Sequence, residues 1–175
     1  SMSFNEILSM TRDFSRINSV WGALIKGSSV CFGYASAYTY LMNRRGIPCA
    51  TVCGNNSEET LGTGHAWNIA ELNGEWCHID CIFSDWEQSE ESKSRGEVSY
   101  VYFGLNDTQN SLSHNFKLPF AEGMPRCAST KNNYFRVKNL LFDSVDLRKI
   151  ANRVVDVLQE SGFGIKKTGY KTIQI

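Results

Sequence analysis

Three side chains along this chain, Cys31, His65 and Asp80, are of the types that thiol catalysis requires. A thiolate can attack a carbonyl carbon, an imidazole can carry the proton, and a carboxylate can orient the imidazole. Together they predict acyl transfer from a carboxamide or peptide amide through a thioester on Cys31. The substrate would be a protein or peptide, and the fold must bring the three groups together.

A two-residue turn sets the pairing of the strands that carry His65 and Asp80. Residues 64–72 and 75–83 have the alternating composition of strands. The Asn-Gly pair at 73–74 is the strongest two-residue hairpin signal, because a type I′ turn needs positive φ at both positions. The sequence therefore predicts an antiparallel hairpin in which Leu72 pairs with Glu75.

That register places His65 and Asp80 on one face of the hairpin. Asp80 would lie opposite Trp67 and diagonal to His65, and diagonal neighbours are roughly 7–8 Å apart at the backbone. An imidazole and a carboxylate can bridge this distance, so we expect them within hydrogen-bond reach. The same face would hold Trp67, Trp76 and His78, and the opposite face Ala66, Cys77, Ile79 and Cys81.

Cys31 is predicted to lie in the first turn of a helix over residues 29–43. Ser28 or Ser29 can cap the start of this helix, and Gly46 suits a left-handed stop after its end. A helix N-terminus stabilises a thiolate and lowers the pKa of the thiol. Its free N–H groups, including that of Cys31, can also bind an oxyanion.

Three further side chains are candidates for the oxyanion site or the pocket wall: Trp21, Trp67 and His78. Trp21 is expected to occupy a core position, and as the alternative its indole N–H could donate to an oxyanion. Trp67 and His78 share the hairpin face with His65, and Trp67 fits a core position equally well. His78 and His114 are both expected to be non-catalytic, although His78 could line the site, and the stretch 107–114 has no predicted place.

Four cysteines, at positions 49, 53, 77 and 81, are expected to be buried and unpaired within each strand. Residues four apart on a strand are roughly 13 Å from each other, which is too far for a disulfide. The chain has no Cys-x2-Cys pair and no calcium-loop spacing, so neither a metal nor a cofactor is predicted. A Cys-rich metal-binding domain is the weakest alternative.

Several motifs together resemble bacterial transglutaminase-like domains. They are Val30-Cys31-Phe32-Gly33-Tyr34-Ala35, Gly46-Ile47, Gly64-His65-Ala66-Trp67-Asn68, Asn73-Gly74-Glu75-Trp76 and His78-Ile79-Asp80. The likeness continues through 102–107 and His114 to 133–135, and it covers roughly residues 20–175. Two departures are the short segment before Cys31 and the run Cys81-Ile82-Phe83, where the family often has Thr and Trp.

The resemblance implies an α+β, papain-like fold, with a central helix carrying Cys31 packed on an antiparallel β-sheet carrying His65 and Asp80. It assigns the nucleophile to Cys31, the general base to His65 and the orienting carboxylate to Asp80. The triad does not separate a protease, a deamidase and a cross-linking transglutaminase. The alternative from another class is a catalytically silent module that binds a peptide or protein on the same fold.

The remaining numbers suit one domain over residues 1–175. The chain is 42% hydrophobic, enough for a real core, and no apolar run is long enough to span a membrane. Lys+Arg and Asp+Glu are 18 each, so no electrostatic nucleic-acid partner is indicated.

Residues 1–19 form a short N-terminal segment, expected to be truncated relative to the family, and Ser1 before Met2 is typical of a cloning scar. No targeting segment is seen, and buried thiols suit a cytoplasmic or a secreted domain.

The expected order begins with helices at 3–16 and 29–43, followed by strands at 47–53, 64–72, 75–83 and 98–105. A long loop over 106–132, a strand near 134–138, a helix at 145–161 and a strand at 164–175 complete it.

Overall fold

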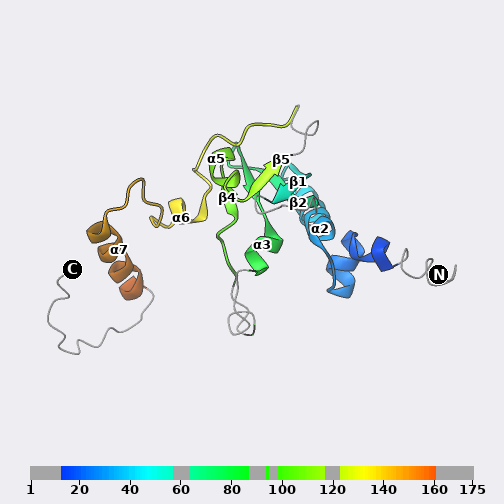
Figure 1. Ribbon diagram of the computed structural model, residues 1–175, viewed down its shortest axis with the longest axis horizontal. Helices are drawn as coiled ribbons and strands as arrows, with labels where there is room; N and C mark the ends of the chain where they lie inside the picture. Colours follow the sequence, from blue (N-terminus) through cyan, green and yellow to red (C-terminus); the bar gives the residue numbers. More distant parts are fainter. Residues whose placement is uncertain (1–12, 57–63, 87–93, 95–97, 117–122, 161–175) are drawn as a thin grey trace. The chain divides into compact units, whose positions relative to one another are not determined.

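The computed structural model describes residues 13–56, 64–86, 94, 98–116 and 123–160 (Figure 1). Contacts divide the chain into two compact units, Ser1–Tyr134 and Phe135–Ile175, and each is described by itself. Within the described residues, no helix is both long and apolar enough to cross a membrane.

The first unit is an α+β structure built on a five-stranded antiparallel sheet with strand order β4-β3-β2-β1-β5. The strands are β1 (Cys49–Asn56), β2 (Gly64–Leu72), β3 (Glu75–Ile79), β4 (Phe103–Leu105) and β5 (His114–Phe116). Because β5 pairs with β1 on the far side of β2, it adds a segment of the predicted loop to the edge of the sheet.

The β2–β3 hairpin has the register that the sequence predicts. Leu72 pairs with Glu75, and the pairing continues without a slip to Asn68 and Ile79. Asn73 and Gly74 have φ of 53° and 76°, the left-handed values that a type I′ turn requires. The prediction of turn type and strand pairing is therefore confirmed.

The prediction that the second hairpin strand runs to residue 83 is wrong, because β3 ends at Ile79 and helix α3 (Cys81–Trp86) follows. Asp80 Oδ1 accepts hydrogen bonds from the backbone N–H groups of Ile82 at 2.8 Å and Phe83 at 3.0 Å. This is the N-cap arrangement, in which a carboxylate satisfies the free donors of a helix start. The apolar run after Asp80 concealed that capping signal.

Other boundaries also differ from the predictions. The strand expected at 98–105 shrinks to β4, and the expected loop at 106–132 contains helix α5 (Asp107–Asn110) as well as β5. The segment near 134–138 is not a strand but helix α6 (Tyr134–Val137). The strand expected at 164–175 and the first ten residues of the helix expected at 3–16 lie outside the described residues.

Helix α2 (Cys31–Arg44) packs on β1 and β2 and covers one face of the sheet (Figure 1). Tyr38 and Met42 pack against a core cluster on that face, formed by Cys49, Ala70, Cys77 and Ile79. A second cluster on the opposite side comprises Val52, Trp67, Ile69 and Cys127. The two clusters separate Trp67 from Cys77 and Ile79, as the predicted alternation requires.

The start of α2 is held differently from the prediction. Its N-cap is Val30, which makes no side-chain cap, so neither Ser28 nor Ser29 caps the helix. The Ser29 hydroxyl instead donates to the carbonyl oxygen of Ile17 at 2.6 Å, which ties the start of α2 to the preceding segment. The predicted stop is confirmed, because Gly46 has φ of 74°.

A buried amide fixes α2 against β2. Asn68 Nδ2 donates to the carbonyl oxygen of Ala35 at 2.8 Å and to Thr39 Oγ1 at 2.9 Å. Since Asn68 lies three residues after His65 and Ala35 four residues after Cys31, these bonds link the elements that carry the two residues.

The second unit contains helix α7 (Leu147–Glu160), close to the predicted bounds of 145–161. Asp146 Oδ1 accepts from the backbone N–H groups of Arg148 and Lys149, both at 3.1 Å, and so caps the start of this helix.

Candidate active site

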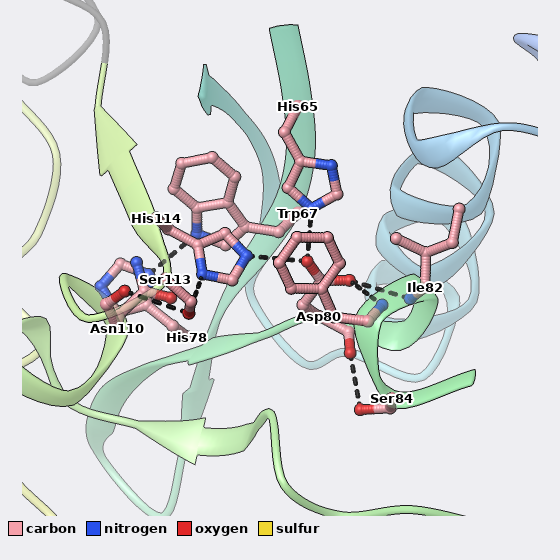
Figure 2. Close-up of polar contacts among 10 residues, drawn as sticks. His65, Trp67, His78, Asp80, Ile82, Ser84, Asn110, Ser113 and His114 are labelled. Carbon is pink, nitrogen blue, oxygen red and sulfur yellow. Dashed lines mark hydrogen bonds and ion pairs between the residues drawn. The ribbon is translucent and has the colours of Figure 1, made fainter. Parts of the chain in front are cut away.

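Asp80 is the centre of the site (Figure 2). It is 2% exposed, and its Oδ1 is held by the two backbone N–H groups at the start of α3. Oδ2 bonds His65 Nε2 at 2.5 Å and His114 Nε2 at 2.8 Å. Burial disfavours the anion, but the hydrogen bonds from His114 and His65 outweigh it and hold the pKa of Asp80 at about 2.

His65 lies at the start of β2 and meets Asp80 directly, as predicted from the hairpin register. Its ring stacks on Phe83, with ring centroids 4.5 Å apart. Because Nε2 is bound to Asp80, Nδ1 is the nitrogen left to bond the Cys31 sulfur. Burial opposes a charge on this ring, but hydrogen bonds with Asp80 and Cys31 prevail and raise its pKa to about 9.

Cys31 is the first residue of α2 and is half-buried. Its hydrogen bond with His65 lowers the pKa of the thiol, burial opposes that shift, and the backbone N–H groups of Ala66 and Phe32 support it. The opposite shifts of Cys31 and His65 have one physical meaning: the site favours a thiolate beside an imidazolium.

The other five cysteines behave differently. All six are free; Cys49, Cys77 and Cys127 are buried, whereas Cys53 and Cys81 are half-buried. Burial raises the pKa of each of the five, to about 11 for Cys77 and about 12 for Cys81 and Cys127. The four cysteines predicted to be unpaired are unpaired, but the expectation of burial is met fully only by Cys49 and Cys77.

His114 is the site residue that sequence reasoning missed. It is 1% exposed, and a hydrogen bond of 2.7 Å joins its Nδ1 to the Ser113 hydroxyl. It reaches Asp80 because β5 pairs with β1, where His114 lies opposite Asn56. These residues are 58 positions apart in the chain, so no local pattern around His114 signals the contact.

His78 and Trp67 lie on the hairpin face that the register predicts, but they bond to each other. Trp67 Nε1 donates to His78 Nδ1 at 3.1 Å, and His78 Nε2 lies 3.0 Å from Asp107 Oδ1. Burial lowers the pKa of His78, against the opposing effect of Asp107. The Trp67 ring stacks beside His65 at 6.0 Å, so it forms a wall of the site.

Trp21 is 43% exposed, so the prediction of a core position for it is wrong. The charged ends of Arg16 and Lys26 lie over its ring, 5.9 Å and 4.9 Å from the centroid. Its role as an oxyanion donor stays a prediction.

Two clusters in the described part of the chain have the composition of metal ligands: His65, Asp80 and His114, and His78, Asp107 and Cys127. Ligand atoms about 2.0–2.1 Å from a tetrahedral zinc would be roughly 3.3 Å from one another. The two nitrogen-to-oxygen distances at Asp80 Oδ2 are 2.5 Å and 2.8 Å, which are hydrogen-bond lengths.

In the second cluster, the hydrogen bonds of His78 determine which of its ring nitrogens carries the hydrogen. An indole N–H only donates, so His78 Nδ1 must accept from Trp67, and the hydrogen of the neutral ring is on Nε2. A nitrogen carrying hydrogen cannot ligate a metal. In this structure both clusters are therefore hydrogen-bond networks.

Comparison with known sequences finds a similarity to one protein family. A sequence profile described as the transglutaminase-like superfamily matches residues 3–81, a range that contains Cys31, His65 and Asp80. No curated protein sequence matches the chain.

Proposed function

We propose that this chain, whose residues 3–81 belong to the transglutaminase-like superfamily, is a thiol enzyme that acts on a carboxamide or peptide amide through a thioester on Cys31. One observation carries the proposal above all. Cys31 alone among the six cysteines has a lowered thiol pKa, and the first cause is its hydrogen bond with His65. That pairing supports a nucleophile with its base in place.

The first half-reaction forms the thioester. The Cys31 thiolate attacks the carbonyl carbon, a C–S bond forms, and negative charge moves to the carbonyl oxygen. The free N–H groups at the start of α2, including that of Cys31, are suited to bind this oxyanion. As the C–N bond breaks, the His65 imidazolium gives its proton to the departing nitrogen, which leaves as ammonia or an amine.

The second half-reaction resolves the thioester. Neutral His65 takes a proton from water or from a second amine, which attacks the thioester carbonyl. The C–S bond then breaks and the Cys31 thiolate is restored beside the imidazolium. Throughout both halves, Asp80 Oδ2 holds His65 Nε2 so that the other ring nitrogen serves the sulfur and the substrate.

Hydrolysis and amine transfer share these groups, so activity assays must separate them. The full chain would be incubated with glutamine-containing peptides, alone and with a fluorescent primary amine. Ammonia release, amine incorporation and peptide cleavage would be followed by a coupled assay and mass spectrometry. Ammonia release without incorporation indicates a deamidase, incorporation a transglutaminase, and cleavage a protease.

The matched controls are two cysteine variants. Cys31→Ala should abolish each activity, and Cys53→Ala, which removes another half-buried thiol, should keep it. A silent binding module would give none of the three products and would trap no acyl-enzyme on Cys31. That result, with the Cys31 thiol unreactive, would contradict the proposal.

A further inference from the structure

One carboxylate oxygen, Asp80 Oδ2, bonds two imidazoles. Figure 2 shows the His65 and His114 rings reaching it from different sides. Only His65 shares a hydrogen bond with Cys31, so the two histidines cannot have the same task. His114 is the unexplained partner.

Its surroundings fix His114 in place. The Trp67 and Phe83 rings lie 4.8 Å and 4.9 Å from its ring, and Tyr102 meets it edge-on at 5.9 Å. Both ring nitrogens are engaged, Nδ1 by Ser113 and Nε2 by Asp80. Such a ring has little freedom to turn.

The protonation of the contact follows from Asp80. An ionised carboxylate only accepts hydrogen bonds, so His114 Nε2 carries hydrogen whether the ring is neutral or cationic. The Ser113 hydroxyl can donate to Nδ1 or accept from it, and it therefore suits either state. His114 is thus a donor to Asp80 under all conditions in which Asp80 is ionised.

His65 does not keep a constant charge. In the proposed reaction it gives up the proton on Nδ1, so the buried carboxylate loses a neighbouring cation although His65 Nε2–H still donates to Oδ2. A buried carboxylate that has lost a cationic neighbour depends more strongly on its remaining hydrogen bonds. We propose that His114 is a positioning residue that keeps Asp80 ionised, with Oδ2 directed at His65, through both charge states of His65; this inference rests on the proposed function.

Among the residues that the structure describes, the other titratable groups around Asp80 do not supply a donor of this kind. Cys31 and Cys81 line the same narrow space as Asp80, and the Asp80 anion raises the pKa of Cys81. His78 and Asp107, beyond His114, are bonded to each other. In support, the hydrogen bond from His114 is the first of the interactions that lower the pKa of Asp80 against burial.

The test compares two substitutions in the full chain. His114→Phe keeps a ring but removes the donor, whereas His114→Gln retains an N–H that can reach Oδ2. The alkylation rate of Cys31 by iodoacetamide would be measured against pH, and the Asp80 carboxyl would be titrated by carbon NMR. Asn115→Ala, an exposed change on β5, is the matched control.

We expect His114→Phe to raise the pKa of Asp80 and to move the Cys31 rate midpoint to higher pH by about one unit, roughly tenfold in rate below the midpoint. His114→Gln should recover most of the wild-type profile. If Phe leaves both profiles unchanged, or if Gln behaves like Phe, His114 acts only by packing and the inference is overturned.

Two further results keep the test decisive. Should His114→Phe fail to fold, nitrogen NMR of the wild-type chain must show hydrogen on His114 Nε2 from pH 4 to 9, and a bare Nε2 would refute the inference. A wild-type Cys31 no more reactive than the other cysteines would instead overturn the proposed function, which distinguishes the two failures.

Discussion

The two carboxylate oxygens of Asp80 have different hydrogen-bonding roles. Oδ1 caps α3 and Oδ2 binds the imidazoles. The hairpin register predicted its contact with His65 correctly, although Asp80 itself lies just beyond the paired strand. The capping role and the His114 contact were not predicted, because one was hidden by an apolar run and the other depends on strand pairing far along the chain.

Replacing Asp80 with Asn should separate the capping of α3 from the binding of the imidazoles. The remaining amide oxygen can still cap α3, but an N–H₂ group would face two imidazole donors and force His65 towards the other tautomer. We expect the Cys31 alkylation rate near pH 7 to fall at least about tenfold, and the melting temperature to fall less than it does in Asp80→Ala.

Asp80→Ala is the comparison, because it removes the cap as well. Loss of an N-cap lowers the free energy of unfolding by about 1 kcal/mol, and the two imidazoles left without their hydrogen-bond acceptor lower it further. An Asp80→Asn variant that labels at the wild-type rate would show that Asp80 does not orient His65.

At the scale of elements, the residues of turns and helix ends predicted the structure reliably. The pairing of strands that are far apart in the sequence was not predicted. Asn73-Gly74 fixed one hairpin and Gly46 ended one helix, since each depends on a backbone conformation that few residues adopt. The short strand β5 has no comparable signal. Three residues are too few for a periodic pattern, and their partner strand β1 is distant in the sequence.

The start of α2 offers an element-scale prediction. A Cβ at Gly33 would lie 1.9 Å from Ser29 Oγ and 2.7 Å from the Ile17 carbonyl oxygen. Gly33→Ala should therefore displace the N-terminus that carries Cys31, costing about 1–3 kcal/mol of unfolding free energy. We expect slower Cys31 alkylation together with a lower urea midpoint.

Gly46→Ala, at the other end of α2, is the matched control. Its φ of 74° makes Ala strained by about 1–2 kcal/mol, but a Cβ there meets nothing within 4 Å. This variant should lose stability while Cys31 keeps its reactivity. Equal loss of reactivity in both variants would mean that general destabilisation, and not the helix start, controls the thiol.

At the scale of the whole molecule, buried titratable groups set the dependence of stability on pH. Folding lowers the pKa of Cys31 and raises the pKa of His65, so the folded chain favours a deprotonated thiol and a protonated imidazole. His65 therefore stabilises the fold fully below pH 6.5 and loses that contribution as the pH rises towards about 9, whereas the lowered pKa of Cys31 acts in the opposite direction below pH 9.0. Asp80, lowered from 3.8, stabilises the fold above pH 3.8 and loses that contribution as the pH falls towards about 2.

Above pH 9, three thiols whose pKa values are raised by burial make the stability of the fold depend on pH. Cys77, Cys81 and Cys127 stay neutral in the folded chain to about pH 11 or 12, whereas in the unfolded chain they ionise near 9.0. The folded state then binds more protons, so stability falls as pH rises, by up to about 1.4 kcal/mol per pH unit for each thiol.

Urea unfolding under reducing conditions at pH 5, 7, 9 and 10 would measure this. Cys127→Ala should lower stability at every pH but make the decline above pH 9 shallower. A decline as steep as that of the wild type would contradict the assignment to Cys127.

The central claim is that Cys31 is an activated thiol, and site-resolved alkylation tests it most directly. Folded protein would be treated with iodoacetamide across pH 5–10, and each of the six cysteines followed by mass spectrometry. We predict that Cys31 reacts faster than the other five, with a rate midpoint below the ordinary thiol pKa of about 8.5, and that His65→Ala slows it near neutral pH. Slow Cys31 labelling, indistinguishable from the other thiols and insensitive to His65→Ala, would contradict the account.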